Sequence, residues 1–198
     1  MSDPANSQDL QDRLTLIESM IAEGRHQTGS WGWAFVLWGV AYCAAIGLAA
    51  WTHSPWSWPA TILVAILVTV VLATRQAGHG PSTTLGRAVG SVWLALGISM
   101  CVLFLPLGFT GRLSDPHLFP AIVCAILGLA HGASALIVRW KIQFACALLW
   151  WVAAVLTCFG TPAQTNAVFL AAIFLGQIVF GLYATLAHAQ HAQRRSHA

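Results

Sequence analysis

The chain has 198 residues, of which 58% are hydrophobic and only 8% are charged, whereas soluble domains carry about 25% charged residues. This composition excludes an ordinary water-soluble domain, and the formal net charge of +3 gives no indication of nucleic-acid binding. The five cysteines contain no CxxC pair, so neither a metal cage nor a disulfide framework is expected. We expect the protein to work without a metal or a cofactor.

Residues 1–30 are polar and lack the short apolar region of a cleavable signal peptide, so we expect a cytoplasmic arm followed by a retained membrane anchor. The arm contains an amphipathic helix over residues 7–24, SQDLQDRLTLIESMIAEG. One apolar stripe runs along this helix at helical spacing and consists of Leu10, Leu14, Ile17 and Ile21. Gly24 is a candidate for its C-terminal end.

Three roles of the amphipathic helix remain open. It can lie along the inner membrane surface, although its acidic polar face suits an anionic leaflet poorly. It can pair with itself in a homo-oligomer, because the spacing of its apolar stripe is that of a heptad seam. It can also dock on a cytosolic protein partner.

Six apolar runs follow the arm and predict six transmembrane helices, since roughly 20 helical residues cross about 30 Å of hydrocarbon, although the second run is short for a span and needs Trp56 and Trp58 to extend it to the interface. They are Trp31–Trp51, Pro59–Thr74, Ala88–Phe109, Leu118–Val138, Ile142–Gly160 and Ala167–His188. The runs are continuously apolar rather than alternating, which favours helices over barrel strands. Short connections make neighbours antiparallel. We therefore predict an all-α transmembrane domain over residues 31–188, built as three helical hairpins in one bundle.

The basic residues predict the orientation of this bundle. With the N-terminus in the cytoplasm, eight of the nine Lys and Arg residues fall on the inner side, and Arg112 alone falls on the outer side. This is a strong positive-inside bias, so both termini are expected in the cytoplasm. The His-rich tail over residues 189–198 is expected to be a solvated basic segment near anionic headgroups. The compact loops favour a bacterial inner membrane.

Small residues recur along three of the predicted spans, where they allow close helix packing in the absence of a hydrophobic drive between helices in lipid. They are Gly32, Gly39, Cys43, Gly47 and Ala50 in the first span, Gly86, Gly90 and Gly97 in the third, and Gly128 and Gly132 in the fourth. We expect these faces to pack within the chain, with contacts between chains as the alternative.

No Asp, Glu, Lys or Arg lies inside a predicted span, which argues against proton relays, voltage sensors and ion-coupled pumps. The polar residues that remain as candidate pore or substrate contacts are His131, Gln177, Tyr42, Tyr183 and Ser134. His131 and Ser134 are three apart and share a helix face. We expect a neutral His131 to be hydrogen-bonded to Ser134 or Tyr183, because an unpaired polar group in hydrocarbon is costly.

These features favour an accessory, regulatory or scaffold membrane subunit that acts through protein contacts of its N-terminal helix. The alternative is a channel or facilitator for a small neutral solute, with a pore lined by His131, Gln177 and Tyr42. No paired acids, nucleophile–base pair or phosphate-binding loop indicates an enzyme.

Overall fold

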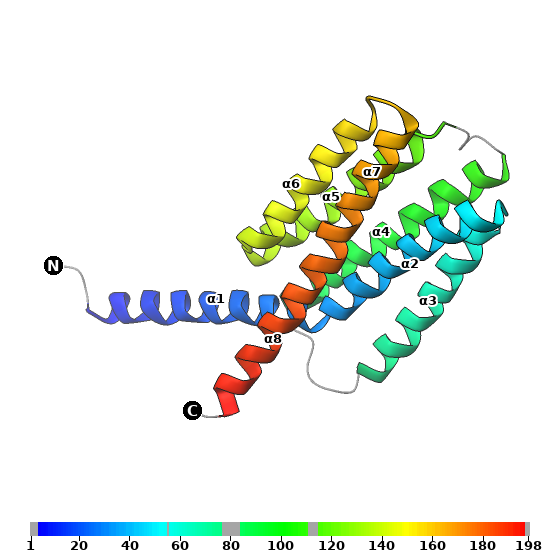
Figure 1. Ribbon diagram of the computed structural model, residues 1–198. Helices are drawn as coiled ribbons and strands as arrows, with labels where there is room; N and C mark the ends of the chain where they lie inside the picture. Colours follow the sequence, from blue (N-terminus) through cyan, green and yellow to red (C-terminus); the bar gives the residue numbers. More distant parts are fainter. Residues whose placement is uncertain (1–3, 55, 77–83, 111–114, 197–198) are drawn as a thin grey trace.

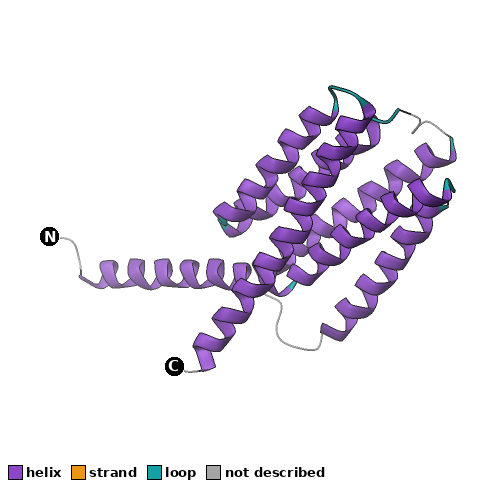
Figure 2. Ribbon diagram, in the orientation of Figure 1, coloured by secondary structure: helices purple, strands orange, loops and turns teal. Residues whose placement is uncertain are grey.

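The computed structural model describes residues 4–54, 56–76, 84–110 and 115–196. Within these ranges the regular elements are all helices, with no strand (Figure 2). They are α1 (Pro4–Ser30), α2 (Gly32–Thr52), α3 (Ser57–Gln76), α4 (Thr84–Phe109), α5 (Leu118–Val138), α6 (Lys141–Thr157), α7 (Pro162–Ile173), the π-helix η1 (Phe174–Val179) and α8 (Phe180–Ser196). The last three follow one another without a break.

Five stretches of the described chain are long and apolar enough to cross a membrane: Gly32–Thr52, Ser57–Gln76, Thr84–Gly108, Leu118–Val138 and Pro162–Gln190. The fifth predicted span, Ile142–Gly160, corresponds to α6, which is apolar but has only 17 residues. It ends at Thr157, three residues before the predicted end, because the chain turns at Cys158 to Gly160 to enter α7. The chain is therefore a helical bundle with the composition of a multi-pass membrane protein.

Helix α5 is the most buried of the five candidate spans and packs most extensively against α6, beside which it lies in Figure 1 and to which the short Arg139–Trp140 turn joins it. Each predicted hairpin pair is in contact: α2 with α3, α4 with α5, and α6 with α7. Helix α2 also packs along η1 and α8, whereas α3 packs chiefly on α2. The buried core between these helices includes Phe35, Leu127, Trp150, Phe169, Ile173 and Phe180.

The predicted small-residue faces of α2 and α5 pack within the chain at four glycines, Gly32, Gly39, Gly128 and Gly132. A Cβ on Gly39 would lie 2.7 Å from Ile178 Cγ1, and the indole of Trp151 on α6 lies over both Gly128 and Gly132. By contrast, a Cβ on Gly90 or Gly97 of α4 would meet no atom within 4 Å among the described residues. Intrachain packing is therefore observed at Gly32 and Gly39 of α2 and at Gly128 and Gly132 of α5, whereas Gly47 and Ala50 of α2 are exposed and a Cβ on Gly47, like one on Gly90 or Gly97, would meet nothing within 4 Å in the described structure.

The helix ends on one side of the bundle are tied together. Thr161 and Gln164 form a capping box at the start of α7, an arrangement that satisfies two otherwise unpaired backbone N–H groups. The His117 Nδ1 atom lies 3.0 Å from the Thr157 carbonyl oxygen and 2.8 Å from the Thr165 hydroxyl. These contacts place the start of α5, the end of α6 and the start of α7 at the same end of the molecule.

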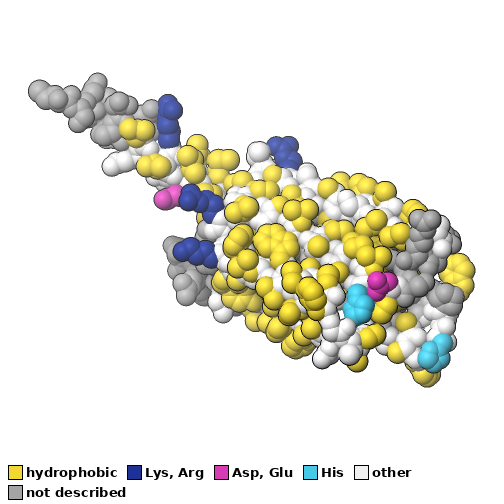
Figure 3. Space-filling model, turned by 90° about the horizontal axis from the view of Figure 1, so that it is seen from above, with side chains coloured by type: hydrophobic (Ala, Val, Ile, Leu, Met, Phe, Trp, Pro, Cys, Tyr) yellow, Lys and Arg dark blue, Asp and Glu magenta, His cyan; other side chains and the backbone are white. Residues whose placement is uncertain are grey.

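The surface of the bundle is largely apolar (Figure 3). In that view the Lys and Arg side chains lie toward the end from which α1 leaves the bundle, and His side chains lie toward the opposite end. Large apolar side chains such as Leu94, Val102 and Leu136 are more than two-thirds exposed. An apolar surface of this kind suits contact with lipid.

Candidate functional site

The first candidate site is the apolar stripe on α1. Leu10, Leu14 and Ile17 are each more than half exposed, and Ile21 is partly exposed. They belong to α1, which extends away from the end of the bundle (Figure 1). The stripe therefore presents apolar area that the described part of the chain leaves uncovered.

The C-terminal part of α1, its base, packs against the bundle and anchors the helix there. Gly24 does not end the helix as predicted, since α1 continues to Ser30. Gly24 is buried, and a Cβ there would lie 3.2 Å from Val138 Cγ1 and 3.3 Å from Leu85 Cβ. Because Gly24 has no side chain, α1 can pack closely against Leu85 and Val138. One turn later, the buried Thr28 hydroxyl donates to the Gly24 carbonyl oxygen at 3.0 Å.

The second candidate site surrounds His131, which has no exposed surface. Its ring stacks on Phe35 of α2, with ring centroids 5.3 Å apart. It also makes edge contacts with Trp93 of α4 at 5.1 Å and Phe180 of α8 at 5.2 Å. Aromatic rings from three helices therefore surround this imidazole of α5, and we call Phe35, Trp93 and Phe180 around His131 the His131 box.

The expected hydrogen bond of His131 is not found. Neither ring nitrogen has a partner among the described residues, and the buried Ser134 hydroxyl has none either. Tyr183 is 42% exposed and packs against Trp140, with ring centroids 6.3 Å apart. The prediction failed because α8 is rotated so that Phe180, one turn earlier, faces the imidazole.

Gln177 lies in η1, where the helix widens to π geometry. Its side chain is buried, and its Oε1 atom has no partner in the described structure. The neighbouring Gly176 carbonyl oxygen accepts a hydrogen bond from the Cys146 thiol at 3.3 Å. A Cβ on Gly176 would collide with the indole nitrogen of Trp150. A π-helical turn at such a position is frequent at functional sites.

Gln143 is a buried polar residue that the sequence analysis did not single out. It lies in the first turn of α6, has no exposed surface, and both its side-chain oxygen and nitrogen lack partners within the described chain. Tyr42, a predicted candidate, is also buried, and it lies between Trp38 and Trp58 at centroid distances of 6.0 and 6.3 Å. Buried polar side chains therefore occur on α2, α5, α6 and η1.

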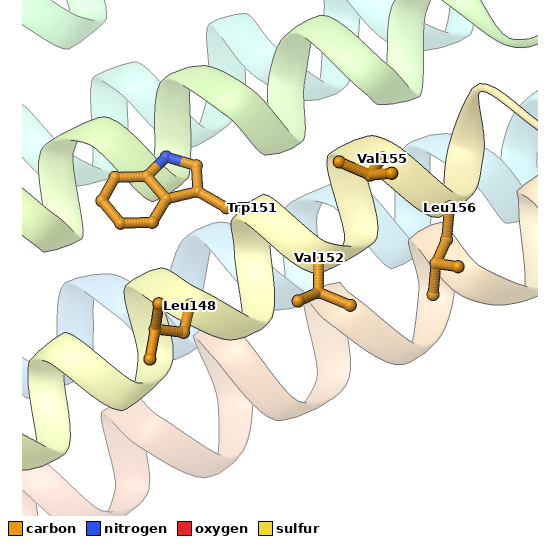
Figure 4. Close-up of a pocket in the computed structure, with 5 residues that line it drawn as sticks. All are labelled: Leu148, Trp151, Val152, Val155 and Leu156. Atoms are coloured by element: carbon orange, nitrogen blue, oxygen red, sulfur yellow. The ribbon is translucent and has the colours of Figure 1, made fainter.

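Figure 4 shows a shallow apolar depression on α6, lined by Leu148, Trp151, Val152, Val155 and Leu156. All five side chains come from one helix, and the only polar atom among them is the indole nitrogen of Trp151. This surface suits lipid acyl chains and carries no catalytic groups. In the described residues, no group of three His, Cys, Asp or Glu side chains is arranged to hold a metal ion. The His191 side chain lies outside the described set.

Comparisons with known protein families, with curated proteins and with solved structures found no match to this chain.

Proposed function

We propose that this chain is an accessory or scaffold subunit of a membrane assembly and acts through protein contacts of α1. The observation that carries the proposal is the exposed stripe of Leu10, Leu14 and Ile17 on a helix whose base is packed into the bundle. Contiguous exposed apolar side chains on an otherwise polar segment mark an interaction site. A helix anchored at Gly24 holds this stripe in a fixed position, which lowers the entropy cost of binding.

The bundle that anchors α1 is proposed to cross a bacterial inner membrane six times, with both termini in the cytoplasm. Helix α6 is about 25 Å long at 1.5 Å per residue, slightly less than the hydrocarbon thickness. The contacts of His117 with Thr157 and Thr165 support its crossing, because they join the start of α5 to the end of α6. If α5 crosses, α6 must return across the same layer.

Deletion of residues 1–22 tests the proposed contact, since it removes the stripe and leaves Gly24 and Thr28 in place. The truncated chain is expected to insert normally but to lose its partner in co-purification and to migrate as a smaller complex. A full-length chain carrying Gln8→Ala, an exposed change outside the stripe, is the matched control. Unchanged partners and complex size after the deletion would contradict the proposal.

Reporter fusions at each terminus and at the Arg139–Lys141 turn test the proposed topology. All three reporters are expected to report the cytoplasmic side. A fusion at Gly160 is expected to report the opposite side, because it follows α6. Opposite sidedness of the two termini would exclude an even number of crossings.

A facilitator for a small neutral solute is the second candidate function. It is favoured by buried side-chain atoms that have no hydrogen-bond partner within the described residues. They belong to Trp93, His131, Ser134, Gln143, Trp150 and Gln177. Groups of this kind suit contact with water or a polar solute. Solute uptake in proteoliposomes tests it: Gln177→Leu is expected to reduce uptake, while Tyr183→Phe, at an exposed position, leaves it unchanged.

A further inference from the structure

We infer that the partner of α1 is the α1 of a second copy of this chain, paired in parallel along Leu10, Leu14, Ile17 and Ile21. The inference rests on the proposed function, because it names the partner that the exposed stripe binds. It commits to one occupant, one direction and one register. A foreign protein and the membrane surface are alternatives that the experiment below distinguishes.

The four residues are spaced by four, three and four positions, which is the alternation of a coiled-coil seam. The same spacing continues through Gly24 and Thr28, but these residues are buried against the bundle of their own chain. The seam open to a partner therefore ends at Ile21. This seam covers about three helical turns. Its single row of side chains matches the contact face of one partner helix.

Charges beside the seam fit a second copy in parallel. With Leu10 and Ile17 at d positions and Leu14 at an a position, Arg13 occupies g and Glu18 occupies e. In a parallel pair, a g residue faces the e residue five positions further along the partner helix. Arg13 of each copy then faces Glu18 of the other, and the two-fold symmetry of a dimer makes this pair twice.

The direction of α1 is compatible with this pairing. Figures 1 and 3 both show α1 leaving the end of the bundle and pointing away from it. Two copies inserted in one membrane with the same orientation project their α1 helices from the same side and in the same sense. An α1 lying flat on the lipid surface would instead turn along the end of the bundle.

A seam of two heptads is marginal for isolated helices in water. The membrane compensates for this, because bundles confined to one bilayer have a high effective concentration for each other. We therefore expect pairing of the intact chain in a bilayer, and the experiment uses the full-length protein for that reason.

The test measures energy transfer between donor- and acceptor-labelled full-length chains in liposomes of fixed protein-to-lipid ratio. Arg13→Glu alone places Glu opposite Glu18 twice, and Glu18→Arg alone places Arg opposite Arg13 twice. Each single variant is expected to raise the dissociation constant roughly tenfold, as two attractive exposed pairs become repulsive. The double variant Arg13→Glu/Glu18→Arg is expected to restore wild-type transfer, and so is a mixture of the two single variants.

Leu14 and Leu16 provide a matched pair of controls, because both are leucines with nearly equal exposure, 59% and 61%. Leu14→Asp, in the seam, is expected to abolish transfer, whereas Leu16→Asp, outside it, leaves transfer unchanged. Equal effects of the two substitutions would show that transfer does not depend on the seam and would overturn the inference. A monomeric wild type, or single charge variants with unaltered transfer, would overturn it as well. Either failure leaves the proposed function standing if deletion of residues 1–22 still removes another protein in co-purification.

Discussion

Gly32 and Gly181 meet backbone to backbone where α2 packs against α8. A Cβ on Gly181 would lie 2.8 Å from the Gly32 carbonyl oxygen, and a Cβ on Gly32 would lie 2.7 Å from the Gly181 carbonyl oxygen. Each glycine thus makes room for the other helix. In lipid, where close packing drives helix association, this contact holds the first and last spans of the described bundle together at the base of α1.

Gly181→Ala is expected to destabilise the bundle by about 1–3 kcal/mol, the usual cost of forcing extra volume into a packed interior. The added methyl group meets backbone, which cannot move aside as a side chain does. Gly97→Ala is the matched control, since a Cβ there meets nothing within 4 Å in the described structure. Denaturation in mixed micelles, followed by loss of helical circular dichroism, measures both. Equal stability of the two variants would show that the α2–α8 approach is looser than described.

The His131 box predicts that the imidazole lowers stability. Both ring nitrogens are buried among Phe35, Trp93 and Phe180 with no partner in the described part of the chain, and a buried polar group without a partner costs about 1–3 kcal/mol. His131→Phe keeps a ring and removes both nitrogens, so unfolding free energy is expected to rise by about 1 kcal/mol. Thermal unfolding in detergent measures the change, with Tyr183→Phe as a control expected to stay within about 0.5 kcal/mol.

A marked loss of stability in His131→Phe would show that the ring holds a hydrogen bond. If the facilitator function is correct, the same variant is more stable but transports more slowly. Stability and uptake then change in opposite directions, which separates a functional histidine from a structural one.

The hydropathy of the sequence was enough to predict the helical bundle, because span length and composition are properties of each segment alone. Relations between segments were less predictable. Spacing placed His131 and Ser134 on one face, but not the rotation of α8 that brings Phe180 rather than Tyr183 against the imidazole. Gly24 has the sequence signature of a helix end, and only its packing against Leu85 and Val138 shows why the helix continues.

Two parts of the second candidate site had weak sequence signals. Gln143 follows Lys141 at the start of an apolar run, so its amide reads as part of the membrane boundary. Its complete burial depends on how α6 packs in the bundle. The π-helix likewise depends on tertiary contacts, because Trp150 of α6 packs directly on Gly176.

The contacts of His117 with Thr157 and Thr165 predict a coupling between three helix ends. Thr165→Val removes a buried hydroxyl that lies 2.8 Å from His117 Nδ1 and 3.3 Å from the Thr157 carbonyl oxygen, so a loss of about 1 kcal/mol is expected. His117→Ala is expected to cost a similar amount. Because both substitutions break one network, the double variant should cost less than the sum. Thr74→Val, at an exposed site, is the control, and strictly additive losses would contradict a shared network.

Trp151 packs over Gly132, so we expect a larger side chain at position 132 to compensate for a smaller one at position 151. A Cβ on Gly132 would lie 2.8 Å from Trp151 Cη2, so the indole already fills the space above the glycine. Gly132→Leu is expected to destabilise the α5–α6 pair by about 1–3 kcal/mol through overpacking, and Trp151→Ala by about 2–4 kcal/mol through the lost contacts of a half-buried ring. In the double variant the leucine occupies the volume that the indole leaves. The loss of unfolding free energy should therefore be smaller than the sum of the two single losses, and smaller than the loss from Trp151→Ala alone. Unfolding of all three variants in the same micelles measures this, and a double variant as unstable as the two losses added would place the indole elsewhere than over Gly132.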